Sequence, residues 1–413
     1  MGQEARYRKK DILLGPGVNI YRTPLNGRNF EYMGEDPYLV SRMVVPYIKG
    51  VQVNGVAACV KHYVLNNQET RRNFTDVDLS DRALYEIYLP AFKAAVTEGK
   101  AWSVMGSYNK YRGQYCTHNE VLVKKILKGD WGFDGVFISD WSSTHDTKEA
   151  ALYGLDIEMG TGSDGLTYSL KNAYDNYFLA YPFLEMIKSG ELDESVVDEK
   201  VRRILKLMLR TTMDTDRPQG SKGSQAHFDL AREVAQEGIV LLKNDDNFFP
   251  VSTDKEIKIA VIGENATRKM SVGGGSSELK PIHEISALAG ISERFINASI
   301  EHTMGYASGP SVYGYVIPSP LDADSLRKVA VETAKKADIV LFIGGLNKSH
   351  KQDCENGDRE DLALPFGQDE LIEDILKVNK NTGVILLSGN AVAIRLRDSR
   401  KKCELAGRKE LTG

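Results

Sequence analysis

The sequence has 413 residues, of which 42% are hydrophobic and 27% charged, and its formal net charge is -4. This size allows two domains with a core in each, and the composition is that of a globular rather than a disordered protein. The slight acidity gives no reason to expect a nucleic-acid partner, and no apolar run is long enough to cross a bilayer. The opening "MGQEARYRKKDILL" lacks the apolar core and cleavage site of a secretory signal.

The cysteines argue against a disulfide framework or a zinc knuckle. They are far apart and form no CxxC pair, so we expect unpaired thiols at Cys59, Cys116, Cys354 and Cys403. The His- and Arg-containing stretch 61–72 has no metal-ligand spacing either. We therefore expect neither a metal nor another cofactor.

The first half alternates between strand-like and helical patterns. Amphipathic segments at 36–53, 80–98 and 119–128 separate the candidate strands, which are 11–16, 56–63, 102–109, 136–141 and 155–162. Such alternation predicts a parallel sheet or a (β/α) barrel.

Polar residues follow the apolar run of several of these strands. Asp140 and Trp141 come directly after the apolar "VFI" of 136–138, and Lys61–His62, Ser107–Asn109 and Glu158 occupy similar places. A carboxylate at a strand end can simply cap the next helix. Several strands that end in this way favour a functional site instead, because the carboxyl ends of barrel strands meet on one face.

The second half predicts a separate α/β layered domain. A long helix over 192–210, with Asp193 as its N-cap, precedes the Pro-, Gly- and Ser-rich stretch 215–225. A helix near 227–242 and apolar runs at 257–263, 337–345 and 382–390 then predict buried parallel strands. We assign residues 1–212 to the first domain, 213–226 to a linker and 227–413 to the second domain.

Two loops of the second half carry chemistry-bearing residues. The loop "SVGGGSSELKP" (271–281) matches neither the dinucleotide fingerprint nor the P-loop, which leaves a flexible turn or a sugar-contacting loop. The loop "KQDCENGDREDL" (351–362) is either a solvated charged loop or the source of a second catalytic carboxylate. Retaining glycoside hydrolysis needs two such groups, about 5 Å apart.

Several long stretches, in the same order, resemble glycoside hydrolase family 3 in its β-glucosidase-like branch. They are "LGPGVNIYRTPLNGRNFEYMGEDP" (14–37), "KHYVLNNQET" (61–70), "VMGSYNKYRGQYCTHNE" (104–120), "WGFDGVFISDW" (131–141), "GGGSS" (273–277), "GGLN" (344–347) and "ENGDR" (355–359). The resemblance implies an incomplete (β/α)8, TIM-like barrel followed by a partial α/β sandwich domain with a mostly parallel sheet.

The resemblance also implies roles for individual residues. Asp140 matches the nucleophile that forms the glycosyl-enzyme intermediate, and Glu355 matches the acid/base on a loop of the second domain. The positions that match contacts to the nonreducing sugar are Arg28, Lys61, His62, Arg72, Met105, Tyr108, Trp141 and Ser276. The implied activity is retaining removal of β-linked glucose from oligosaccharides or aryl glucosides, with the active site between the domains.

The chain departs from the family at both ends. It opens at what would be the third barrel strand, and the charged stretch 395–413 has no clear family match. The alternatives are therefore a β-xylosidase or mixed β-glycosidase, an inactive sugar-binding fragment, and a nucleotide-binding α/β protein suggested only by the Gly-rich loop. Family members are often periplasmic or secreted, but the sequence specifies neither a compartment nor an oligomeric state, and we expect no nucleic-acid or membrane partner.

Overall fold

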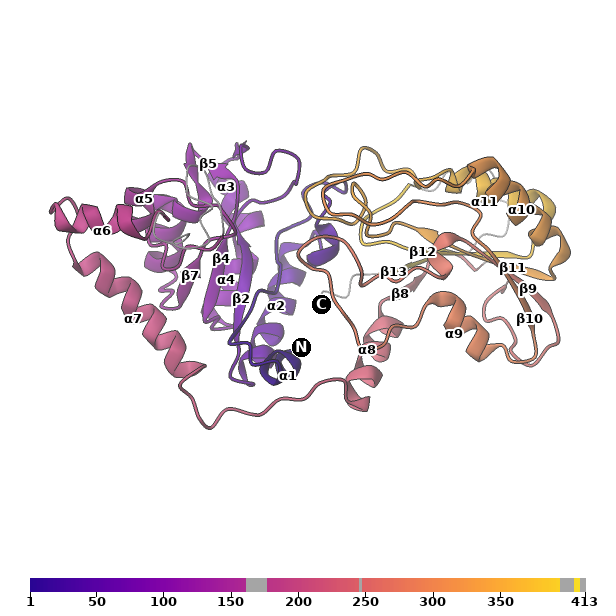
Figure 1. Cartoon of the computed structure of the whole chain (residues 1–413), viewed down its shortest axis with the longest axis horizontal. Helices are drawn as coiled ribbons and strands as arrows, with labels where there is room; N and C mark the ends of the chain where they lie inside the picture. Colours follow the sequence, from indigo (N-terminus) through magenta and orange to yellow (C-terminus); the bar gives the residue numbers. More distant parts are fainter. Residues whose placement is uncertain (161–176, 245–246, 394–404, 409–413) are drawn as a thin grey trace. The chain divides into compact units, whose positions relative to one another are not determined.

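The computed structural model describes residues 1–160, 177–244, 247–393 and 405–408 (Figure 1). They form two compact units: Met1–Arg22 with Tyr32–His227, and Thr23–Glu31 with Phe228–Leu411. Each unit contains a parallel or mostly parallel sheet with helices beside it, which confirms the expected α/β class. Cys403 and most of the stretch 395–413 lie outside the described residues.

The first unit is built on a four-stranded parallel sheet. Its strand order is β1 (Ile12–Leu13), β2 (Ala57–Tyr63), β4 (Ser103–Gly106) and β7 (Val136–Ile138). Four of the five predicted strands are thus present. The fifth, predicted at 155–162, is reduced to one bridge from Ile157 to Ile138 within its described part.

Both faces of this sheet are apolar. Successive side chains of a strand point to opposite faces, and each face carries apolar residues that pack in a cluster. Val60, Val104 and Phe137 belong to the core that includes α2 (Pro37–Gln52), α4 (Pro90–Thr97) and η4 (Glu120–Asp130). Cys59, Met105 and Ile138 lie in a second cluster, with Ile204 and Leu207 of α7 (Ser195–Arg210). This second face is the one toward which Met105 points.

Shorter elements complete the first unit. They are α1 (Gly2–Tyr7), β3 (Asp76–Val77), α3 (Asp81–Ala83), η2 (Leu84–Tyr88), β5 (Lys110–Tyr111), β6 (Gln114–Tyr115), η3 (Cys116–His118), α5 (Thr147–Leu152) and α6 (Tyr181–Lys188). Among the described helices none is long and apolar enough to span a membrane.

Helix α7 begins at Ser195, three residues later than the predicted start. The carboxylate of Asp193 does accept the N–H of Ser195 at 2.9 Å, although Glu194 occupies the N-cap position. The helix packs on the sheet through Ile204 and Leu207, whereas Leu205 is 49% exposed.

The stretch predicted as a linker is hydrogen-bonded to the N-terminal helix. Arg6 Nε donates to the carbonyl of Pro218 at 2.9 Å, and the N–H of Ser221 donates to that of Gln3 at 3.2 Å. His227 Nδ1 lies 3.0 Å from Glu4 Oε1. Residues 218–227 are thus anchored within the first unit.

The second unit is a layered α/β structure. Its six-stranded sheet has the order β10 (Ser299–Thr303), β9 (Lys258–Ile262), β11 (Ile339–Gly345), β12 (Thr382–Leu387), β13 (Leu405–Arg408) and β8 (Ile239–Leu241). All neighbouring strands are parallel except β13 and β8. The three predicted apolar strands are present, whereas β8, β10 and β13 were not predicted, and β8 lies at the end of the stretch 227–242 that was predicted to be helical.

Helices cover both faces of this sheet (Figure 1). One face packs against α10 (Ala323–Lys336) and α11 (Gln368–Val378), and the other against α9 (Ala287–Arg294). The remaining elements are α8 (Gln225–Glu237), η1 (Asn29–Glu31) and η5 (Glu264–Ala266). The chain after β9 carries Ser276, and the loop after β11 carries Glu355.

Candidate active site

Asp140 lies two residues after β7, where it is 6% exposed. Its Oδ1 accepts two hydrogen bonds, from the Tyr108 hydroxyl at 2.9 Å and from the N–H of Trp141 at 2.7 Å. Its Oδ2 lies 3.5 Å from His62 Nε2. The two bonds to one oxygen fix the rotation of the carboxylate, so that a buried oxyanion is aimed in one direction.

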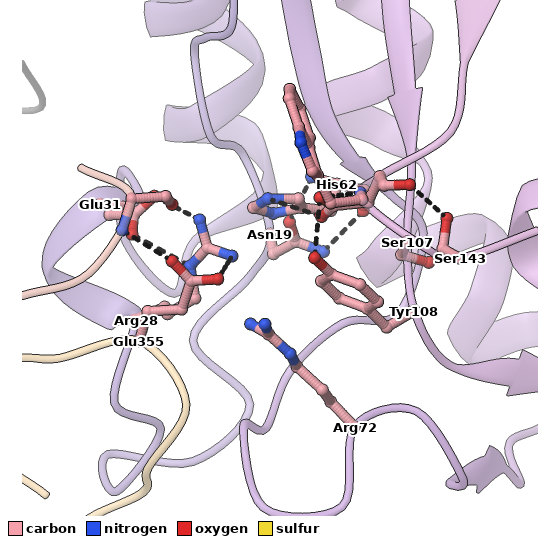
Figure 2. A network of polar contacts seen from close by, with 12 residues as sticks. Asn19, Arg28, Glu31, His62, Arg72, Ser107, Tyr108, Ser143 and Glu355 are labelled. Carbon is pink, nitrogen blue, oxygen red and sulfur yellow. Dashed lines mark hydrogen bonds and ion pairs between the residues drawn. The ribbon is translucent and has the colours of Figure 1, made fainter. Parts of the chain in front are cut away.

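Tyr108 and Arg72 lie face to face. The Arg72 guanidinium carbon is 4.1 Å from the centroid of the Tyr108 ring, and Nη1 of Arg72 lies 2.6 Å from Oε2 of Glu69. Glu69 is 3% exposed. The pair with Glu69 and the cation–π contact with Tyr108 hold the guanidinium beside the tyrosine that donates to Asp140. Figure 2 shows Arg72 next to the Tyr108 ring.

His62 is held from both its backbone and its ring. Asn19 accepts the N–H of His62 at 2.7 Å and donates to its carbonyl at 3.0 Å. The Tyr32 hydroxyl lies 3.2 Å from Nδ1 of the ring. With Nδ1 engaged in this way, Nε2 is directed to Asp140.

The other predicted residues of the first unit take different positions. Trp141 is 42% exposed beside Asp140, and Lys61 is half-buried on β2 next to His62. Met105 is 2% exposed and packs in the apolar cluster with Ile138. The structure therefore brings His62, Tyr108 and Trp141 against Asp140, with Arg72 against Tyr108, and it places Met105 in a core cluster.

A chain of hydroxyl groups supports the turn that carries Asp140. Ser143 Oγ donates to the carbonyl of Asp140 at 3.0 Å and lies 2.9 Å from Thr117 Oγ1, which donates to the carbonyl of Ser107 at 3.0 Å. Ser107 in turn donates to the carbonyl of Val64. These buried bonds connect the residues after β2, β4 and β7, so the three strand ends hold one geometry.

Glu355 lies in the second unit, 5% exposed, between two groups that approach different oxygens. Nη1 of Arg28 lies 3.5 Å from Oε1, and the N–H of Ser276 donates to Oε2 at 2.9 Å. Arg28 also makes a two-pronged pair with Glu31, at 3.0 Å from Nε and 2.8 Å from Nη2 (Figure 2). One buried arginine thus faces two carboxylates.

The glycine-rich turn is shaped around Glu355. Gly275 has φ +101, and a Cβ placed there would lie 2.5 Å from the Cβ of Glu355. The N–H of Glu355 donates to the carbonyl of Gly274 at 2.9 Å. The glycines therefore allow close backbone approach to a carboxylate, and the loop is an ordered support.

The segment Thr23–Glu31 joins the second unit although it comes early in the chain. Its Gly27 carbonyl accepts the N–H of Cys354 at 2.9 Å, and the N–H of Gly27 donates to Asp358 at 3.0 Å. A Cβ on Gly27 would lie 2.2 Å from the carbonyl oxygen of Gly357. This close fit places Arg28 against Glu355.

Two carboxyl groups, the buried Asp353 and the partly buried Glu158, have raised pKa values. Burial raises the pKa of Asp353, even though it accepts the N–H of Gly389 at 2.8 Å and an amide proton of Asn390 at 3.1 Å. Burial likewise raises the pKa of Glu158, which accepts the N–H of Leu179.

Within the described ranges no group of three or more metal-ligating side chains is arranged to hold an ion.

Several supporting residues were missed from the sequence. Glu31 lies three residues from Arg28 and Glu69 lies three residues from Arg72, a spacing at which side chains on one turn can meet. That spacing could have identified both glutamates. Asn19 and Tyr32 carry no such signal, because their partner His62 is 43 and 30 residues away.

Family models match most of the chain. The Glycosyl hydrolase family 3 N terminal domain matches residues 1–207, and the Glycosyl hydrolase family 3 C-terminal domain matches residues 239–404. The chain is 57% identical to the β-glucosidase BoGH3A of Bacteroides ovatus over 399 residues, which are 95% of this chain and 53% of that protein. It is also 34% identical to an exo-α-(1→6)-L-arabinopyranosidase of Bifidobacterium longum, over 95% of this chain and 49% of the relative.

A solved structure is similar over the same region. The β-glucosidase 3B of Thermotoga neapolitana, in complex with α-D-glucose, superposes with a TM-score of 0.81 at 33% identity, covering 98% of this chain and 57% of that one. The chain thus spans about half the length of the relatives that it matches.

Proposed function

The chain belongs to glycosyl hydrolase family 3, and we propose that it is built to remove β-linked glucose from the nonreducing end of a glucoside with retention of configuration. The observation that carries the proposal is Asp140, a buried carboxylate after a parallel strand with two hydrogen-bond donors on one oxygen. The named β-glucosidases among its relatives agree with this substrate. None of the relatives described above is a xylosidase.

In the proposed reaction Asp140 is the nucleophile. Its carboxylate attacks the anomeric carbon, and the glycosidic C–O bond breaks as the Asp140 ester forms. The bonds from Tyr108 and Trp141 hold the attacking group so that little reorganisation is needed. Arg72, Lys61 and His62 supply donors for sugar hydroxyls.

Glu355 is the proposed acid/base. In the first step its carboxyl proton passes to the departing oxygen, and in the second step its carboxylate takes a proton from the water that hydrolyses the ester. The N–H of Ser276 and the guanidinium of Arg28 orient the group. In this scheme Arg28 and Ser276 contact the sugar as well and Trp141 supplies apolar surface, whereas Met105 stays in the core cluster with Ile138.

Azide rescue separates the two roles. Each displacement inverts the anomeric carbon, so azide attacking the glycosyl ester in Glu355→Ala gives β-glucosyl azide, whereas azide attacking the substrate in Asp140→Ala gives α-glucosyl azide. Both variants should lose about 10³-fold or more in kcat on a 4-nitrophenyl β-glucoside. Exchange of the two products would reverse the assignment, and activity that survives Asp140→Ala without azide would refute it.

Substrate preference is tested in the same assay. The parent chain should release nitrophenol faster from the β-glucoside than from the β-xyloside or the α-L-arabinopyranoside. A faster reaction with either of the latter would replace glucose as the proposed sugar. A folded chain that binds glucose and releases nitrophenol from none of them would be an inactive sugar-binding fragment.

A further inference from the structure

The loop 311–315 of the second unit lies directly against Glu355. The position that a Cβ on Gly275 would occupy is 2.9 Å from Oε2 of Glu355 and 3.1 Å from Cε2 of Tyr313. Since both distances start from one point, the Tyr313 ring and the Glu355 carboxylate cannot be further apart than their sum. The ring and the carboxylate are therefore near neighbours on two sides of Gly275.

Further contacts hold this loop in place. A Cβ on Gly273 would lie 2.8 Å from the Cβ of Ser311, and one on Gly314 would lie 3.6 Å from the amide nitrogen of Asn356. Ser311 accepts a hydrogen bond from Arg268 at 2.7 Å. The loop therefore passes close to the glycine turn and to the Glu355 loop, and the bond from Arg268 holds it at Ser311.

Tyr313 nevertheless keeps half of its surface exposed, at 51%. A half-exposed tyrosine beside a buried carboxylate is suited to bind a ligand, because its ring has a flat apolar face and a polar tip. The proposed reaction already places a ligand there. A general acid must lie within hydrogen-bond reach of the atom that it protonates, which is the oxygen between the sugar and the leaving group.

We propose that Tyr313 is the platform for the leaving group, and that the enzyme thereby favours β-glucosides whose aglycone is a flat aromatic ring. This inference rests on the proposed function, since it takes Glu355 as the acid. In the proposed reaction the first atoms of the aglycone lie next to Glu355. The Tyr313 ring and the Glu355 carboxylate both lie close to the Cβ position of Gly275, at 3.1 Å and 2.9 Å. Ring stacking is worth a factor of about 2 to 10 in affinity.

The test compares phenyl and methyl β-glucoside, which share the sugar and differ in the aglycone. Tyr313→Ala should lower kcat/KM for the phenyl glucoside about 3- to 10-fold and change that for the methyl glucoside by less than about twofold. Tyr313→Phe should keep the parent ratio. The matched control is Tyr315→Ala, because Tyr315 is 70% exposed on the same loop, and it should leave the ratio unchanged.

A binding measurement makes the test independent of turnover. In an Asp140→Asn background, titration calorimetry with phenyl and methyl 1-thio-β-glucoside should give a phenyl preference that Tyr313→Ala removes. An equal loss for both ligands, or a loss in Tyr315→Ala as well, would overturn the platform while the proposed function stands. Failure of glucose and of both thioglucosides to bind would overturn the proposed function and this inference with it.

Discussion

Each of the two arginines at the candidate sites is held by a glutamate three residues away. Arg28 pairs with Glu31 in the second unit, and Arg72 pairs with Glu69 in the first. Both glutamates are buried, so these pairs are not screened as surface ion pairs are. Their main effect is to fix the plane of a guanidinium before a ligand arrives.

Removing the charge of Glu69 tests this positioning role. Glu69→Gln should raise KM for 4-nitrophenyl β-glucoside about tenfold with a smaller change in kcat, because Arg72 loses the partner that orients it for binding. Steady-state kinetics measure both constants. Glu86→Gln removes the exposed pair with Arg82 and should change neither; equal losses in the two variants would contradict the role.

Gly275 permits a geometry that no other residue can adopt without strain. Gly275→Ala should lower kcat at least about tenfold, since the new methyl group would meet the Cβ of Glu355 at 2.5 Å on a backbone with φ +101. Gly290→Ala is the control, because Gly290 lies in α9 and its added Cβ would meet only a side-chain atom of Ile285, at 3.7 Å. Unchanged kcat in Gly275→Ala would show that the turn can relax.

For single residues, the sequence predicts which positions carry functional groups better than it predicts which residues those groups contact. The strand "VFI" before Asp140 and the glycines before Ser276 are local patterns, and both lie where the patterns place them. The partner of Arg28 in the loop of Glu355 is more than 300 residues away, and no periodicity reports such a pair. For Met105, in contrast, the alternation of side chains along β4 is enough to explain why it packs in an apolar cluster.

Among the elements, the segment Thr23–Glu31 is fixed to the second unit by buried amide groups. Asn390 accepts from Asn29 Nδ2 at 2.7 Å and donates to the carbonyl of Asn26 and to Asp353, both at 3.1 Å. These three bonds connect the segment to the loops after β11 and β12. The segment carries Arg28, so its attachment also positions the arginine at Glu355.

Asn390→Ala should therefore destabilise the second unit and impair catalysis together. The loss leaves buried donors and a buried carboxyl without these partners, which costs about 1–3 kcal/mol. Urea denaturation measures the stability, and kcat/KM should fall through the displaced Arg28. Asn381→Ala removes an exposed amide that donates to Asp338 and should cost much less; equal costs would contradict a special role for Asn390.

The elements themselves were largely predictable. Long apolar runs such as 257–263 and 337–345 contain β9 and β11, because buried parallel strands need apolar residues on both faces. Strand β10, with the sequence "SIEHT", escaped prediction since it is a polar strand at the edge of the sheet. The grouping of residues 23–31 with the second unit escaped it because that depends on long-range hydrogen bonds.

At the scale of a whole unit, the first unit places three cations around the buried carboxylate of Asp156. Asp156 pairs with Lys128 at 2.8 Å and with Arg203 at 3.4 Å, and Lys200 donates to the carbonyls of Ala150 and Ala151. Burial lowers the pKa of Lys200 to about 7 and that of Lys128 to about 8, from a usual 10.5. Asp156 counteracts part of both shifts.

These lowered values predict that stability rises with pH. Between pH 7 and 10.5 the unfolded chain binds the proton of Lys200 more tightly than the folded one does, so each pH unit adds up to about 1.4 kcal/mol to the free energy of unfolding. The penalty for charging is fully present below pH 7. Lys200→Met should flatten this slope in denaturation curves at pH 7, 8 and 9.

The control for that slope is Lys125→Met, because Lys125 is an exposed lysine paired with Glu120. It should keep the parent's pH dependence. A slope that Lys200→Met leaves unchanged would mean that Lys200 stays charged in the folded unit across this range.

The most direct test of the account is to trap the intermediate on the chain itself. A 2-deoxy-2-fluoro-β-glucoside with a good leaving group forms the glycosyl ester and hydrolyses it slowly, because fluorine destabilises the oxocarbenium-like transition state of both steps. Mass spectrometry of the digested protein should find the fluorosugar on Asp140, and Asp140→Asn should remain unlabelled. Labelling at another residue, or no labelling in a folded chain that binds glucose, would contradict the assignment of Asp140 as the nucleophile.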